Sequence, residues 1–213
     1  MQNEFTGTIP SSIIRLNVLE QLYISHNRIS HTIPASLADL ANLTYLYLDN
    51  NMLSGSIPDS FVQLHSVTFL YLHSNFFTGS VGPVCGLPNL LYNLLYENQF
   101  SGSIPSQIGF SSNLLEIGIY NTFITNTIPS ALGELKAIQN VLLYSNLLSG
   151  RIPSSLSNLH NLINLLLHDN ALDGPLQNFV NASAQYSLAV VDISGNRLTR
   201  YKPPMKPFQL VHD

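Results

Sequence analysis

The side chains of this chain that could carry out chemistry are a few carboxylates, seven histidines and a single cysteine. Two carboxylates held about 5 to 9.5 Å apart could hydrolyse a glycosidic bond. Histidines could transfer protons or bind a metal, and a cysteine thiolate could act as a nucleophile. The candidate carboxylates are Asp49, Glu97, Glu116, Asp169 and Asp192. Which of these reactions is possible depends on the elements that position the side chains.

The composition excludes several classes of protein. Charged residues make up 9% of the chain, against about 25% in a typical soluble protein. The net charge is −4 with only 8 Lys and Arg residues, which argues against nucleic-acid binding because that needs a basic surface. One cysteine allows neither a disulfide framework nor a cysteine-based zinc site. No apolar run approaches the roughly 18 residues that span a bilayer. We therefore expect no nucleic acid, no membrane span within the chain, no metal and no cofactor.

An internal repeat of 24 residues determines the predicted architecture. Asparagines recur at this spacing, with one interval of 23 residues after Asn75, one of 26 before Asn196, and Thr122 in one of the places. Apolar residues recur eight, five and three positions before most of these residues and two positions after every one of them. The pair at −5 and −3 has the alternation of a strand with one buried face. Because one short strand cannot bury its own leucines, neighbouring repeats must stack. We call the recurring asparagines the asparagine ladder: Asn3, Asn27, Asn51, Asn75, Asn98, Asn146, Asn170 and Asn196.

Two further features complete the repeat. The ladder asparagine ends the strand, where its amide can bond backbone groups that would otherwise be unpaired, so we predict a structural role for it. A Ser-Gly-x-Ile-Pro segment follows, as in 54–58 and 101–105. Its glycine permits a positive φ, and its proline can end a short strand. Serines ahead of the next apolar position suit the start of a helical turn.

This pattern, L-x-x-L-x-L-x-x-N-x-L-S-G-x-I-P-x-x-L-x-x-L, resembles the plant-type leucine-rich repeat of receptor-like kinases, receptor-like proteins and polygalacturonase-inhibiting proteins. The resemblance covers 1–200, about eight repeats, and leaves 201–213 as a basic, proline-rich tail. It implies an α/β solenoid, a right-handed superhelix with a parallel sheet on the concave face, a second short strand in each coil, and 3-10 or helical turns on the convex side. Because family ectodomains begin with a signal peptide and carry cysteine caps, we expect the N-terminus to be truncated.

Function is expected on the exposed face of the predicted sheet, at positions −6, −4, −2, −1 and +1, because the leucines are needed for the core. Eight of the ten tyrosines fall there. Strands about 4.8 Å apart would join them into one aromatic track, and tyrosine gives binding sites a large, rigid contact area. The alternative is that the rings only stabilise the sheet by stacking. The predicted ligand-binding residues are Tyr23, Tyr45, Tyr47, Phe69, Tyr71, His73, Tyr92, Tyr96, Tyr120, Tyr144 and His168.

Catalysis is not supported by this arrangement. Glu97 and Glu116 lie on neighbouring predicted strands but five residues apart in register, roughly 16 Å at 3.3 Å per residue. Paired carboxylates must be closer. The histidines show no metal-ligand spacing; His26, His73 and His168 are expected on the concave side, where their titration could make binding depend on pH.

Four other residues have individual predictions. Cys85 takes an apolar position of its repeat and is expected to be a buried, unreactive thiol. Asn93 replaces a strand leucine at −5, which costs about 1–3 kcal/mol unless its amide is bonded. Asn42 and Asn181 begin glycosylation triplets.

The resemblance implies a noncatalytic recognition module that binds a peptide or protein ligand on its concave face, with a possible co-receptor, outside the cell or at its surface, in signalling or defence. The alternatives are a secreted inhibitor of a pectin-degrading enzyme and a nonfunctional gene fragment. Some family peptide receptors hold the ligand's terminal carboxylate with a pair of concave arginines. Here Arg28 and Arg197 lie at opposite ends of the chain, so that ligand class is not expected.

Overall fold

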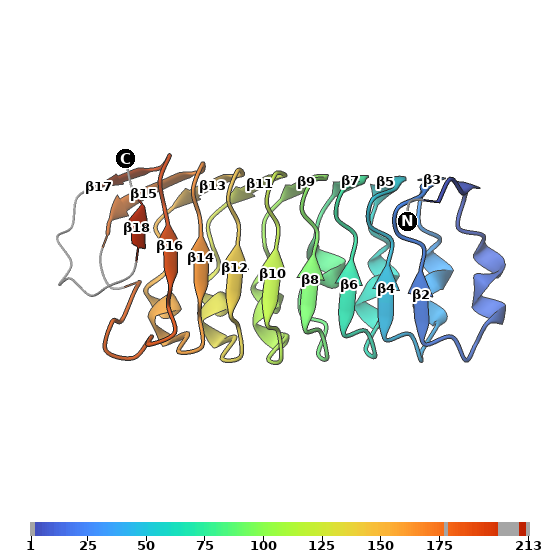
Figure 1. The fold of residues 1–213 in the computed structure, drawn as a ribbon, viewed down its shortest axis with the longest axis horizontal. Helices are drawn as coiled ribbons and strands as arrows, with labels where there is room; N and C mark the ends of the chain where they lie inside the picture. Colours follow the sequence, from blue (N-terminus) through green and yellow to red (C-terminus); the bar gives the residue numbers. More distant parts are fainter. Residues whose placement is uncertain (1–2, 177–178, 200–208, 212–213) are drawn as a thin grey trace.

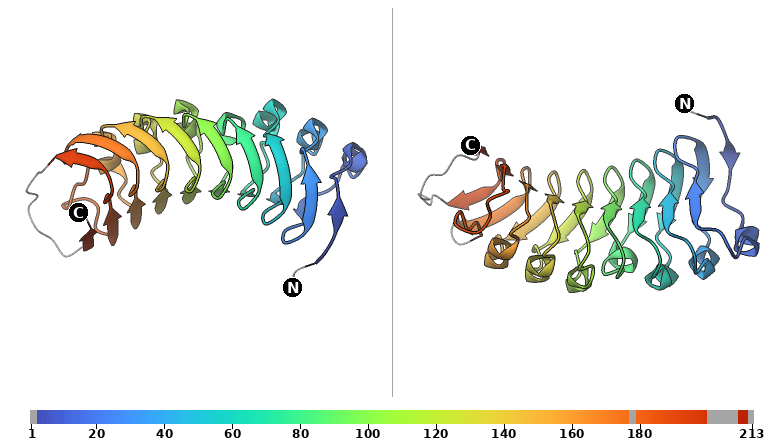
Figure 2. Two further views of the ribbon diagram at one scale, coloured as in Figure 1. Left: turned by 90° about the horizontal axis from the view of Figure 1, so that it is seen from above. Right: turned by 60° about the horizontal axis from the view of Figure 1, so that its bottom comes forward.

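The computed structural model describes residues 3–176, 179–199 and 209–211. These residues form a curved stack of coils along which the chain advances from one end to the other (Figure 1). Two parallel sheets of nine strands each run the length of the stack. One sheet lines the inner side of the curve, and short 3-10 turns lie on the outer side (Figure 2). The predicted solenoid class is confirmed.

The concave sheet is built from the strands that the leucine pattern predicts. Neighbouring strands pair in register, so that a residue lies beside the residue at the same repeat position, as Leu46 does beside Leu70. β18, which falls within the predicted tail, extends this sheet by pairing with β16. The strands are β2 (Gln21–Tyr23), β4 (Tyr45–Tyr47), β6 (Phe69–Tyr71), β8 (Tyr92–Leu94), β10 (Glu116–Gly118), β12 (Asn140–Leu142), β14 (Asn164–Leu166), β16 (Val190–Asp192) and β18 (Gln209–Val211).

From β3 onward, each strand of the second sheet begins directly after a ladder residue. Position +1 therefore lies on this sheet and not on the concave sheet, where we had expected it. Gly55 has a φ of +77°, and a Cβ there would lie 2.8 Å from Thr32 Cγ2. His31 and Asn126 take the same conformation at this position in their repeats. The strands are β1 (Thr6–Gly7), β3 (Arg28–His31), β5 (Met52–Ser56), β7 (Phe76–Gly79), β9 (Gln99–Gly102), β11 (Phe123–Asn126), β13 (Leu147–Gly150), β15 (Ala171–Pro175) and β17 (Arg197–Thr199).

The helical turns are all 3-10 turns, and the described residues contain no α-helix. Serines do not cap them as expected, because no side chain bonds the first turn. Instead, serine hydroxyls donate to the preceding coil, as Ser60 Oγ does to the carbonyl oxygen of Ala35 at 2.8 Å. The turns are η1 (Ser11–Arg15), η2 (Ala35–Asp39), η3 (Asp59–Gln63), η4 (Gly82–Val84), η5 (Ser106–Phe110), η6 (Ser130–Glu134) and η7 (Ser154–Asn158).

The core fills the space between the two sheets and the turns. Cys85 is buried and free there, and burial raises the pKa of its thiol to about 12. Asn93 is fully buried in the repeat whose turn is shortened to three residues. Its Nδ2 donates to the carbonyl oxygen of Val84 at 3.2 Å, whereas its Oδ1 has no partner among the described residues. The amide therefore satisfies a carbonyl that the irregular turn directs inward.

The ladder asparagines bond the backbone of their own and the preceding repeat. Asn98 Nδ2 donates to the carbonyl oxygens of Leu72, Leu95 and Tyr96 at 3.0, 3.0 and 3.2 Å. Its Oδ1 accepts from the N–H of Phe77 at 3.0 Å. The amide thus fixes both the turn out of one strand and the start of the preceding coil's second strand. An acceptor bond of this kind is made by Asn27, Asn51, Asn75, Asn98, Asn146, Asn170 and Asn196.

Replacing Asn98 with alanine should destabilise the stack, because the buried N–H of Phe77 loses its acceptor and the carbonyls lose a shared donor. We expect the free energy of unfolding to fall by roughly 2–4 kcal/mol. Urea denaturation followed by circular dichroism measures this. Asn89→Ala is the control, since Asn89 is exposed and donates only to the carbonyl oxygen of His65. An equal loss in both variants would contradict the role assigned to the ladder.

Candidate functional site

The aromatic side chains of the concave face stand in three columns, because in-register pairing places identical repeat positions beside one another. The −2 column is a stack of five rings whose centroids are 4.2 to 4.4 Å apart and whose planes differ by 7° to 14°. The columns are His73–Tyr96–Tyr120–Tyr144–His168 at −2, Tyr23–Tyr47–Tyr71 at −4 and Tyr45–Phe69–Tyr92 at −6.

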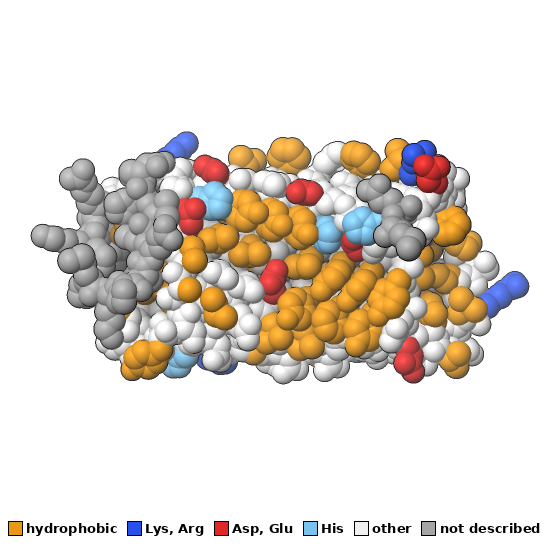
Figure 3. Space-filling model, viewed as in Figure 1, with side chains coloured by type: hydrophobic (Ala, Val, Ile, Leu, Met, Phe, Trp, Pro, Cys, Tyr) orange, Lys and Arg blue, Asp and Glu red, His pale blue; other side chains and the backbone are white. Residues whose placement is uncertain are grey.

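Adjacent columns touch and form one surface over the N-terminal half of the sheet (Figure 3). Phe69 of the −6 column meets Tyr71 of the −4 column edge to face, with centroids 6.4 Å apart. Tyr71 lies 6.1 Å from His73 of the −2 column. The single diagonal track expected from the sequence is therefore a joined set of three columns, which we call the aromatic columns.

Stacking determines what the aromatic columns present to a ligand. Between stacked neighbours of a column, ring faces cover one another, so ring edges and hydroxyls are left for a ligand; Tyr23 differs, because its ring plane is tilted by 55° from that of Tyr47. Burial, together with the neighbouring tyrosines, raises the pKa of Tyr47 and Tyr120 above the ordinary value of 10.0. These hydroxyls are therefore neutral at physiological pH and can both donate and accept hydrogen bonds. Stacking and binding are compatible, because stacking holds the contact surface rigid.

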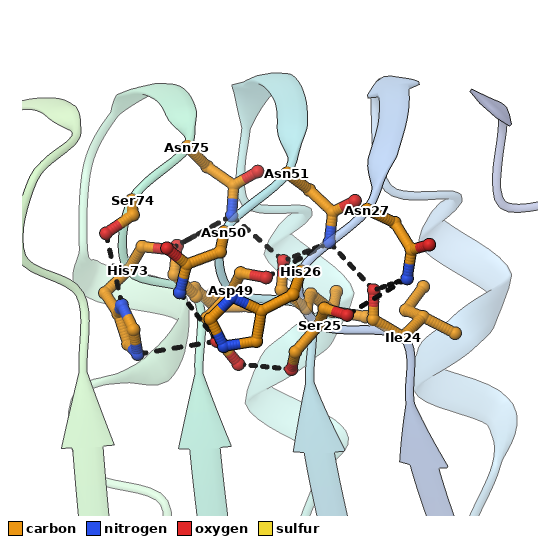
Figure 4. A network of polar contacts seen from close by, with 12 residues as sticks. Ile24, Ser25, His26, Asn27, Asp49, Asn50, Asn51, His73, Ser74 and Asn75 are labelled. Atoms are coloured by element: carbon orange, nitrogen blue, oxygen red, sulfur yellow. Dashed lines mark hydrogen bonds and ion pairs between the residues drawn. The ribbon is translucent and has the colours of Figure 1, made fainter. Parts of the chain in front are cut away.

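A polar cluster borders the columns where the first strands turn upward (Figure 4). Asp49 lies at its centre with only 7% of its side chain exposed, although position −2 was expected to be open. Ser25 Oγ donates to Asp49 Oδ1, and Asn50 Nδ2 donates to Asp49 Oδ2 at 2.9 Å. The Nε2 atoms of His26 and His73 lie 3.8 and 3.7 Å from Asp49 Oδ2. Two imidazoles thus flank one buried carboxylate.

The other carboxylates have separate partners. Glu97 accepts a hydrogen bond from Ser74 Oγ at 2.7 Å, and Glu116 accepts one from Asn140 Nδ2 at 2.8 Å. Asp192 Oδ2 lies 3.2 Å from Nδ1 of His168. Glu116 pairs with the residue five positions before Glu97, as the sequence predicts. In the described part of the chain, no three His, Cys, Asp or Glu side chains are grouped to hold a metal.

The concave face is open rather than deeply hollowed. A shallow depression of about 480 Å³ lies at its N-terminal upper end. Glu4, His26, Arg28, Asn50 and Ser74 are among the residues that line it. An extended ligand therefore suits this face better than a small molecule that needs an enclosing cavity.

Both predicted glycosylation asparagines are exposed. Asn42 Nδ2 donates to the carbonyl oxygen of Asn17 at 3.1 Å, and Asn181 Oδ1 accepts from the N–H of Ser183 at 3.1 Å. Asn42 is also part of a row that the sequence analysis missed, in which a side chain at −9 bonds the preceding repeat. The signal was the recurrence of Asn or Ser at that position. The row contains Asn42, Ser66, Asn89 and Asn161.

A second feature that the sequence analysis missed is an exposed apolar row on the second sheet, on the upper edge of the molecule. It arises because position +1 points outward there. The row contains Met52, Phe76, Phe123 and Leu147, each about half exposed.

Comparison with known proteins agrees with this architecture. A family model for the leucine-rich repeat matches residues 2–53 and 17–77. The LRR ectodomain of the plant membrane receptor kinase GASSHO1/SCHENGEN3 from Arabidopsis thaliana, solved with CASPARIAN STRIP INTEGRITY FACTOR 2, is 31% identical with a TM-score of 0.88. It aligns with 92% of this chain, which covers 23% of that one. The chain is a plant-type leucine-rich repeat protein.

Two further structures show how widely this repeat fold is used. The Arabidopsis receptor kinase HAESA, solved with the peptide hormone IDA and the co-receptor SERK1, is 32% identical to our leucine-rich repeat protein with a TM-score of 0.87, over 92% of this chain and 33% of that one. A plant ice-binding protein is 27% identical with a TM-score of 0.79, over 91% of this chain and 62% of that one. The leucine-rich repeat protein thus spans about a quarter to a third of the receptor ectodomains it resembles. A search of curated proteins found no significant match.

Acidification should destabilise this leucine-rich repeat protein partly through His73. Burial lowers the pKa of His73 below its ordinary 6.5, although the charges of Asp49 and Glu97 act in the opposite direction and that of His26 adds to the lowering. The unfolded chain therefore binds a proton near pH 6.5 that the folded chain does not, so stability is lost as the pH falls below that value.

We expect the melting temperature of the wild type to fall between pH 7.5 and 5.5, and to fall less in His73→Phe, which keeps a ring against Tyr96. His160→Phe is the control because His160 is exposed on the outer side. Differential scanning calorimetry at the two pH values makes the comparison. An unchanged pH dependence in His73→Phe would show that this imidazole is not involved.

Proposed function

We propose that this chain is a noncatalytic recognition module that binds an extended peptide on its concave aromatic columns. The observation that carries the proposal is the joined set of columns, which exposes a rigid tyrosine surface that the core does not use. Tyrosine suits such a role because its large ring loses little conformational entropy on binding. The receptor ectodomains described above, which were solved with peptide ligands, support the same reading.

The geometry of the columns favours a peptide over other ligands. Five strands spaced about 4.8 Å apart carry the −2 column, a length of roughly 19 Å that about six extended residues would span. Ring edges carry partial positive charge and suit peptide carbonyl oxygens, while the hydroxyls can bond either backbone group. A ligand that binds by stacking on ring faces is disfavoured, because most of these faces are already covered by neighbouring rings of the same column.

The proposal extends to the cellular setting. We place the module outside the cell, at the cell surface in a longer protein, with a co-receptor as a possible second partner. The exposure of Asn42 and Asn181 supports glycosylation there. No helical turn among the described residues has the length and apolar character of a membrane span. We propose residues 1–200 as the recognition domain and 201–213 as a tail, of which β18 pairs with β16 at the end of the concave sheet.

Two observations narrow the ligand class. Arg28 and Arg197 lie in strands at opposite ends of the second sheet, which does not favour a pair of arginines that holds a terminal carboxylate. Inhibition of a pectin-degrading enzyme would be favoured by clustered concave carboxylates, and those described here have separate partners. A peptide recognised along its length fits both observations.

Simultaneous alanine substitution of Tyr71, Tyr96 and Tyr120 tests the proposal. The probe is a set of peptides selected from a random phage-displayed library on the wild-type chain. Because each of the three tyrosines is expected to contribute about 1 kcal/mol or more, affinity should fall by about 100-fold or more. Fluorescence anisotropy with labelled peptides measures the loss.

The matched control is Phe110→Ala, which removes an exposed ring from an outer turn and should leave affinity unchanged. If the alanine variant does not fold, the corresponding triple phenylalanine variant keeps the stacking and removes only hydroxyls, and it should still bind more weakly than the wild type. Unchanged affinity in a folded triple variant would show that the peptide does not bind on the concave face.

A further inference from the structure

The concave face carries negative charge with no cationic side chain to balance it. Between positions −8 and −1, the eight described repeats contain no Lys or Arg. The carboxylates at these positions are Glu20, Asp49, Glu97, Glu116, Asp169 and Asp192. Unbalanced charge of one sign on a binding face favours partners of the opposite sign and disfavours partners of the same sign.

Glu116 occupies a special place among these carboxylates, because it continues an aromatic column. The −6 column passes from Phe69 to Tyr92, whose rings are stacked with centroids 5.2 Å apart. The next strand places Glu116 beside Tyr92 in register. One face of the Tyr92 ring is therefore covered by Phe69, while on the side of β10 no described ring lies against it. A carboxylate and the last ring of an aromatic column therefore stand side by side in the middle of the concave sheet.

The surroundings of Glu116 leave its charge available. Glu116 Oε2 accepts one hydrogen bond, from Asn140 Nδ2. The Oδ1 atom of Asn140 in turn accepts a hydrogen bond from Asn164 Nδ2 at 2.7 Å. No salt bridge to Glu116 is formed within the described residues. The side chain is partly exposed. Two residues further along β10, Gly118 is buried, because the side chains of Leu94, Tyr96 and Tyr120 close over it.

We propose that Tyr92 and Glu116 form a seat for a lysine or arginine side chain of the bound peptide, so that the ligand is basic. The cation would lie against the ring face of Tyr92, an interaction that operates within about 6 Å of the ring centroid, and would form a charge-assisted hydrogen bond with the carboxylate. The aromatic columns on the N-terminal side would hold the neighbouring residues of the peptide. This inference rests on the proposed function.

The experiment uses peptides selected on the wild-type chain from a random phage-displayed library. We expect selected peptides to be enriched in Lys or Arg. For each lysine-containing binder, a synthetic copy with Nε-acetyl-lysine keeps the length and removes the charge. The acetylated copy should bind at least tenfold more weakly to the wild type, as measured by fluorescence anisotropy at physiological salt.

Glu116→Gln should reduce the discrimination between lysine and acetyl-lysine peptides to less than threefold. Glu134→Gln is the matched control, because it removes the same charge from the exposed outer turn η6, and it should keep the discrimination. If both substitutions reduced the discrimination equally, it would arise from the overall negative charge of the protein, and the proposed seat at Tyr92 and Glu116 would be wrong.

The outcomes separate this inference from the proposed function. If no peptide is selected, or if binders are unaffected by alanine at Tyr71, Tyr96 and Tyr120, the proposed function fails. If binders depend on those tyrosines but contain no basic residue, or bind equally when acetylated, the cationic seat fails and the proposed function stands.

Discussion

The bonding of the ladder asparagines, from Asn27 onward, to two neighbouring coils is the constraint on which the rest of the structure depends. Because one amide satisfies the turn of its own repeat and the second strand of the preceding one, the coils stack at a fixed register. Register in turn decides what the concave face looks like. It places Tyr96 beside Tyr120 and Tyr120 beside Tyr144, so that a recurring residue type in the sequence becomes a stacked column. Thr122 interrupts the ladder without interrupting the register, since its hydroxyl donates to Asn146 Oδ1.

The columns explain how a face made of ordinary side chains can be both structural and available for recognition. Stacking uses the ring faces, and the edges and hydroxyls remain for a ligand. The −2 column ends in a histidine on each side, and each of these imidazoles lies close to a carboxylate, Asp49 or Asp192. Since this repeat fold serves both peptide-bound receptor ectodomains and an ice-binding protein, the fold alone does not decide the function. The function has to be inferred from the surface, and the surface here combines aromatic contact area with unbalanced negative charge.

The repeat period, the two buried strand positions and the gathering of tyrosines on one face could all be read from the sequence, because each follows from periodicity. The features that could not be predicted from the sequence depend on the orientation and the local contacts of individual side chains. Position +1 moved to the second sheet because that strand starts directly after the ladder residue, which exposes Phe76 and Phe123 on the upper edge. Asp49 is buried because small and polar neighbours close around it, and Asn93 is bonded because a shortened turn directs the Val84 carbonyl inward. None of these follows from spacing alone.

The central claim is that a peptide binds on the concave columns, and hydroxyl-radical footprinting of the chain with and without a selected peptide tests it most directly. Mass spectrometry reports the oxidation of each aromatic side chain. The account predicts that the peptide protects Tyr71, Tyr92 and Tyr96, while Phe110 on the outer turn and Phe123 on the second sheet are oxidised to the same extent in both states. Protection of Phe110 or Phe123 with no change at the concave tyrosines would contradict it.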